Sequence, residues 1–202
     1  MNLFNQLGDF FSNVGELATY LNLRVKINLL EKQGEFDEAI QLTEQSLDLA
    51  RKIWVNGHKN VAITLNNLAL LYNNQGKYNL AEPLYQEALA MGKRLFKTDH
   101  PDVADSLNNL ASLYNNQGKY SEVEPLVQEA LAIYKRLFKR DHPDVADSLN
   151  NLANLYYYQG KYSEVEPLVQ EALAIYKRLF KRDHPDVADS LNNLANLYYY
   201  QG

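Results

Sequence analysis

Paired asparagines recur along this chain, and their side chains are well suited to binding chemistry. The pairs are always 42 residues apart: Asn66-Asn67, Asn108-Asn109, Asn150-Asn151 and Asn192-Asn193. A carboxamide offers one acceptor oxygen and two N–H donors, so it can hold both the C=O and the N–H of a peptide unit. We therefore expect contacts to an extended peptide from the second asparagine of each pair, namely Asn67, Asn109, Asn151 and Asn193, and also from Asn108 and Asn150. The alternative is that one asparagine of each pair bonds the adjacent repeat or faces solvent.

Tyrosines replace asparagines toward the C-terminus. The dipeptides Asn73-Asn74 and Asn115-Asn116 become Tyr157-Tyr158 and Tyr199-Tyr200 in the later copies. Tyrosine combines a rigid apolar ring with a polar tip and is enriched at interfaces. We expect Tyr157, Tyr158, Tyr199 and Tyr200 to line the same groove, which would change from amide-rich to aromatic. Stacking of these rings between neighbouring helices is the alternative.

The other reactive side chains do not converge on one point. All four histidines (His58, His100, His142 and His184) occupy one repeat position. Equivalent residues are then separated by a helix pair, roughly two interhelix distances of ~8–10 Å, whereas metal ligands lie ~2 Å from one ion. We expect these histidines to pack or hydrogen-bond at helix starts. Single carboxylates such as Asp105 do not form an acid/base pair, and no phosphate loop, zinc motif or nucleophile elbow occurs. The sequence predicts no enzyme activity, metal or cofactor.

The elements that carry these side chains follow from an internal repeat, because residues 119–160 and 161–202 are identical. Apolar residues at three- and four-residue steps predict a first helix over 99–117 and a second over 120–138. Asp99 or His100 is placed to cap the first helix, and Gly118 to end it. Ser121 with Glu124 is a capping-box signature for the second helix. Pro125 would then lie within about its first turn.

Composition narrows the class of partner. The net charge is −5 and the pI about 5.4, which argues against nucleic acid because a basic stripe would be expected. No apolar run is long enough to span a membrane, and the absence of cysteine suits the cytoplasm. Among the predicted first helices, only that of the first copy offers basic residues such as Arg24 and Lys26, so a clamp for a peptide C-terminal carboxylate is not expected.

The repeat resembles the tetratricopeptide repeat, on Leu110-Ala111, Tyr114, Gly118, Tyr120 and Ala130. Its period of 42 and its HPDVA, LNNLA, QGKY and EPL segments are similar to the kinesin-light-chain type of that repeat. The resemblance implies an all-α fold, a right-handed α-α superhelix of antiparallel helix hairpins whose first helices line a concave groove.

The predicted array spans 17–202 after an N-terminal capping segment at 1–16. Its hairpins cover 17–54, 60–96, 102–138 and 144–180, with a terminal helix at 186–201. We expect a non-catalytic scaffold that binds an extended peptide or protein segment, without nucleic acid or membrane. The alternatives are a solenoid that self-associates through its open C-terminal end, or the sensor or adaptor fragment of a larger signalling or kinesin-light-chain-like cargo-adaptor protein.

Overall fold

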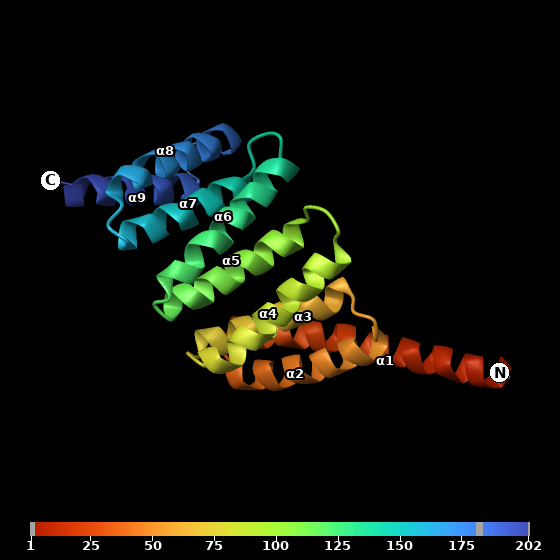
Figure 1. Ribbon diagram of the computed structural model, residues 1–202. Coiled ribbons are helices and arrows are strands. Elements are labelled where there is room, and N and C mark those ends of the chain that lie inside the picture. The colour runs from red at the N-terminus through yellow and green to blue at the C-terminus, as the bar shows by residue number, and fades with distance from the viewer. Residues whose placement is uncertain (1–2, 181–183, 202) are drawn as a thin grey trace. The chain divides into compact units, whose positions relative to one another are not determined.

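The computed structural model describes the backbone of residues 3–180 and 184–201 and the side chains of 14–180, 184–192, 194 and 195. Over these residues the chain is helical and has no strand. The helices are α1 (Leu3–Gln33), α2 (Phe36–Ile53), α3 (Lys59–Asn74), α4 (Tyr78–Leu95), α5 (Pro101–Asn116), α6 (Tyr120–Leu137), α7 (Pro143–Tyr158), α8 (Tyr162–Leu179) and α9 (Pro185–Gln201). Helices α1 to α8 form the predicted antiparallel hairpins, each odd-numbered helix packing on the even-numbered helix that follows it, and α9 packs on α8 (Figure 1). The predicted fold class is confirmed.

Two compact units divide the chain, Met1–Leu95 and Phe96–Gly202. The first unit holds the hairpins α1–α2 and α3–α4, and the second holds α5–α6, α7–α8 and α9. Within each unit the second helix of one hairpin also contacts the first helix of the next, as α2 contacts α3 and α6 contacts α7. Helices α3 and α7 are therefore each packed on two sides.

Glycine closes each hairpin turn. Gly118 has a φ of +72°, and its N–H donates to the carbonyl of Asn115 at 3.0 Å, while the N–H of Lys119 donates to that of Tyr114 at 2.9 Å. These bonds satisfy carbonyls at the end of α5. Only glycine adopts this left-handed conformation without strain, so the glycine stop predicted at this position is confirmed.

The predicted start of the second helix is wrong in one respect. Helix α6 begins at Tyr120, its N-cap residue is Lys119, and that cap makes no side-chain hydrogen bond. Ser121 lies inside the first turn and donates to Glu122 at 2.5 Å. Pro125 is the sixth residue of the helix, beyond the first turn. The capping box does not form because the glycine turn already fixes the chain entering α6.

Helix α1 runs through the boundary predicted at residues 16 and 17. Its side chains before Val14 lie outside the described residues, so a capping role for 1–16 stays a prediction.

Farther along, α1 leaves one face uncovered, with Leu21 50%, Val25 71% and Leu29 54% exposed. The residue equivalent to Leu29 in α7, Leu155, is 2% exposed, because α6 covers that side of α7.

Candidate functional site: two clefts between first helices

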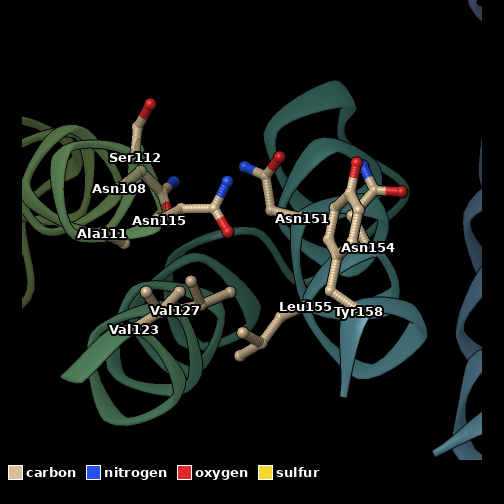
Figure 2. A pocket seen from close by; sticks show the side chains of 10 residues that line it. All are labelled: Asn108, Ala111, Ser112, Asn115, Val123, Val127, Asn151, Asn154, Leu155 and Tyr158. Carbon is tan, nitrogen blue, oxygen red and sulfur yellow. The ribbon is translucent and has the colours of Figure 1, made fainter. Parts of the chain in front are cut away.

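A cleft of about 240 Å³ lies between α5 and α7, with α6 as its floor (Figure 2). Its walls carry amides and hydroxyls and its floor is apolar. The lining residues are Asn108, Ala111, Ser112 and Asn115 from α5, Val123 and Val127 from α6, and Asn151, Asn154, Leu155 and Tyr158 from α7. Figure 2 shows the side chains of Asn115 and Asn151 pointing toward each other across the opening. No ionisable group other than the Tyr158 hydroxyl lines this cleft.

The two asparagines of a pair point in different directions. Successive helical residues are turned by about 100°. Consequently Asn108 on α5 and Asn151 on α7 line the same cleft, whereas Asn109 and Asn150 do not. The Oδ1 atom of Asn150 is instead buried and has no hydrogen-bond partner among the described residues. The cleft between α5 and α7 thus takes the first asparagine of one repeat and the second asparagine of the next.

The two tyrosines at the end of α7 also point in different directions. Tyr158 lines the cleft, is 65% exposed and stacks on Tyr120 at 6.5 Å between ring centroids. Tyr157 is half-buried and packs edge-on against Tyr162 at 5.5 Å. The predicted positions Asn193, Tyr199 and Tyr200 lie outside the residues whose side chains the structure describes.

A second, smaller cleft of about 30 Å³ lies in the first unit, between α1 and α3. Asn67, one of the predicted site residues, lines it. The other lining residues are Arg24, Ile27 and Asn28 from α1, Thr43 and Ser46 from α2, and Thr64 from α3. This cleft has a cation at its wall and hydroxyls in its floor, in contrast to the cleft of the second unit.

The contribution of the even-numbered helices was missed by reasoning from the sequence. The predicted site residues include none of Val123, Val127, Thr43 and Ser46, which line the two clefts from α6 and α2. Ser112 and Asn154 were also overlooked, although their spacing from Asn108 and Asn151 could have shown them. Residues at i+3, i+4 and i+7 share one face of a helix, and Ser112 and Asn115 stand in that relation to Asn108.

The histidines cap helices, as predicted. Nδ1 of His142 accepts the backbone N–H of Asp144 at 3.3 Å, and its ring stacks on Phe138 at 3.5 Å. The same arrangement recurs at His58, His100 and His184. Among the described residues no group of three or more His, Cys, Asp or Glu side chains is placed to hold a metal.

The repeated charges form structural pairs away from the clefts. Arg136 and Arg178 near the ends of α6 and α8 each bind a loop aspartate through two nitrogens, Asp99 and Asp141 respectively. The guanidinium of Arg178 lowers the pKa of Asp141. Asp147 differs, because burial raises its pKa even though it accepts a hydrogen bond from Tyr176. These carboxylates are spread through the repeats and do not form a catalytic pair.

No described helix is long and apolar enough to cross a membrane.

The family model for the tetratricopeptide repeat matches residues 16–94, 60–136, 102–178 and 146–202. No curated protein matches the chain.

Several solved structures share the fold. A protein of Podosopora anserina described as a kinesin light chain with nearly identical TPR-like repeats is 24% identical, with a TM-score of 0.77 over 90% of this chain and 86% of that one. BtubC (BKLC) from P. vanneervenii is 27% identical, with a TM-score of 0.80 over 89% and 72%. A Rap protein complexed with Competence and Sporulation Factor is 17% identical, with a TM-score of 0.74 over 98% and 53%.

Proposed function

We propose that this chain, a member of the tetratricopeptide-repeat family, binds an extended peptide segment across its first helices. Proteins of this family generally act as scaffolds for protein–protein interactions and not as enzymes. The observation that carries the proposal is the cleft between α5 and α7, where amides from two repeats face a single opening.

The chemistry of this cleft suits a peptide backbone. Asn108, Asn115, Asn151 and Asn154 supply both donors and acceptors. The Oδ1 atom of Asn108 is buried and accepts no hydrogen bond from the described residues. A peptide is therefore reached more readily by Asn151 and Asn154, whose side chains are exposed.

The size of the cleft also favours a peptide. Pockets that enclose drug-sized molecules measure ~300–1,000 Å³, more than the volume of about 240 Å³ here. An uncharged apolar side chain of a peptide fits over Val123, Val127 and Leu155 while the amides hold its backbone. Tyr158 extends this contact surface beyond the asparagines.

The test is a pair of double variants that differ only in which asparagine is removed. Fluorescence polarisation would first identify binders among end-blocked nine-residue peptides. Asn108→Ala with Asn151→Ala is expected to weaken binding by about tenfold or more, since each lost hydrogen bond contributes ~0.5–1.5 kcal/mol. The control, Asn109→Ala with Asn150→Ala, removes the same groups outside the cleft. Equal affinity of the two double variants, with unchanged melting temperatures, would contradict the proposal.

Self-association is the second candidate, and the uncovered face of α1 favours it. Leu21, Val25 and Leu29 form a stripe at four-residue steps, and contiguous exposed apolar surface marks interaction sites. Sedimentation across a concentration series would then show an oligomer that Val25→Glu dissociates. A monomer at every concentration would eliminate this candidate.

A further inference from the structure

The loop between α2 and α3 contains an asparagine followed by a glycine, Asn56-Gly57, and this dipeptide occurs once in the chain. We propose that Asn56 loses its side-chain amide spontaneously and that the carboxylate so formed pairs with Arg94. The modification gives the first copy the arginine–carboxylate pair that the later copies encode directly. Neither Asn56 nor Arg94 lines either of the two clefts, so the inference is independent of the proposed function.

Arg94, near the end of α4, lacks the carboxylate that its equivalents in later copies bind. In the next copy the equivalent residue, Arg136, binds the loop residue Asp99 through two nitrogens. Gly57 holds the place of Asp99 in the first copy, 42 residues earlier. Arg94 pairs with no carboxylate among the residues that the structure describes. Its guanidinium is therefore available to a carboxylate that forms beside it.

The guanidinium of Arg94 lies directly against Gly57. A Cβ added to Gly57 would be 2.6 Å from Nη2 of Arg94, so a side chain at residue 57 fits only if the arginine moves. Residue 56 is the neighbouring position, and consecutive Cα atoms are ~3.8 Å apart. A carboxylate on residue 56 consequently forms within reach of the long, exposed side chain of Arg94.

The loop exposes the groups that react. Asn56 is exposed in a turn, and Gly57 has no side chain to hinder attack by its backbone nitrogen. One hydrogen bond, from the Gly57 N–H to the carbonyl of Trp54 at 2.9 Å, holds that nitrogen in the folded loop. A single bond in an exposed loop opens more readily than the bonds of a packed helix. Asparagines such as Asn108 and Asn109 lie inside helices, where the N–H that follows is engaged.

The reaction needs only water. The deprotonated backbone nitrogen of Gly57 attacks Cγ of Asn56, and the new N–Cγ bond closes an imide ring. The bond from Cγ to the side-chain nitrogen breaks, and that nitrogen leaves as ammonia with the proton that the Gly57 nitrogen gave up. Water then opens the imide at either carbonyl, which yields aspartate or isoaspartate. The cation of Arg94 favours both the deprotonated nitrogen and the oxyanion that forms on Cγ.

The first experiment follows the side-chain amides of the full-length chain in buffer at pH 8. Peptide mapping by mass spectrometry measures conversion at each asparagine, and labelling by an isoaspartyl methyltransferase detects isoaspartate. Asn56 should convert before any other asparagine changes measurably. Arg94→Gln should slow the conversion roughly threefold, the size of one surface charge interaction. Lys93→Gln removes the neighbouring charge of α4 and should leave the rate unchanged. Conversion no faster at Asn56 than at Asn108, or equal rates in the two variants, would overturn the inference.

The second experiment tests the ion pair itself. Asn56→Asp encodes one product of the reaction, and Asn56→Gln keeps an uncharged amide at the same position. At low salt Asn56→Asp should melt roughly 1–3 °C above Asn56→Gln, as a single surface ion pair allows. The difference should vanish when Arg94→Gln is added to both variants and persist when Lys93→Gln is added. Equal melting temperatures of Asn56→Asp and Asn56→Gln, or a difference that survives Arg94→Gln, would contradict the pairing with Arg94.

Discussion

The cleft between α1 and α3 and the cleft between α5 and α7 are built from equivalent repeat positions, yet their chemistry is opposite. The first cleft is lined by Arg24 together with Thr43 and Ser46. The second is lined by Asn108 together with Val127, and the residue equivalent to Ser46 is the buried Ala130. Since the helix framework is the same, the difference isolates the effect of the side chains. The lining of a cleft can therefore change through its second helix while the first helices keep the same repeat positions.

The difference also has a cost in stability. The apolar floor of the second unit packs Val127 and Ala130 at 3% and 0% exposure. The first unit places hydroxyls at the same positions and leaves that of Ser46 without a partner. Burying a hydroxyl without a hydrogen bond costs ~1–3 kcal/mol by protein mutational measurements. The first unit therefore holds its polar floor at the expense of folding free energy.

Exchanging the two floors should produce the largest effect. Val127→Thr with Ala130→Ser is expected to lower the free energy of unfolding by about 2–4 kcal/mol, because two hydroxyls enter an apolar site. The reverse exchange, Thr43→Val with Ser46→Ala, should raise it by about 1–2 kcal/mol. Urea unfolding followed by circular dichroism measures both values. Changes of the same sign in the two double variants would show that the floors are not energetically distinct.

Both units have histidine-capped helices, and removing a cap should change the free energy of unfolding by less than the exchange of the floors. His142→Ala should lower the free energy of unfolding by about 1 kcal/mol, the usual cost of a lost N-cap. His142→Asn should recover most of that loss, because asparagine caps well. His58→Ala should cost a similar amount, although its ring stacks on Trp54 at 4.9 Å, whereas His142 stacks on Phe138 at 3.5 Å. If asparagine failed to restore stability at His142, stacking would be the main contribution.

The smallest effect concerns pH and a loop that differs between the units. Asp141 pairs with Arg178, which lowers the Asp141 pKa below its ordinary value of 3.8. Two periods earlier Gly57 occupies the same position. A lowered pKa in the folded state means that the stabilisation is present above pH 3.8 and is lost as pH falls through the folded pKa. The melting temperature of the wild type should therefore exceed that of Asp141→Asn at pH 6, and the two should converge toward pH 3.

Asp147 provides a control of opposite sign for this titration. Its pKa is raised by burial, so its contribution to stability is present below pH 3.8 and is lost as pH rises through the folded pKa. The melting temperature of Asp147→Asn should accordingly gain on that of the wild type between pH 3 and pH 6. Parallel curves for the two variants would contradict both pKa shifts.

The architecture could be predicted from the sequence because its signals are local and repeated. Gly118 marks a turn, His142 precedes a proline that starts a helix, and apolar residues recur at helical steps. The capping box was mispredicted because a second local signal, the glycine turn, fixes the start of α6 one residue before Ser121. Two local patterns competed, and the sequence did not indicate which would determine the helix start.

The cleft was only partly predictable, for a geometric reason. Periodicity identifies Asn108 and Asn109 as exposed candidates, but which neighbour each one faces depends on the rotation of α5 against α6 and α7. Likewise Thr43 and Ser46 look like ordinary helix residues until α1 and α3 are placed around them. Sites assembled from three helices need the packing of those helices, which no single segment of sequence encodes.

The division of each asparagine pair between two directions has a consequence for how such a chain can change length. Adding or deleting a single residue within α7 would turn everything beyond it by about 100°. Asn151 would then leave the cleft that it lines with Asn108. Gaining or losing a whole block of 42 residues preserves every facing direction, as the identical segments 119–160 and 161–202 illustrate. The number of whole repeats can therefore change while the cleft is preserved. Insertions or deletions of other lengths within a helix disrupt it.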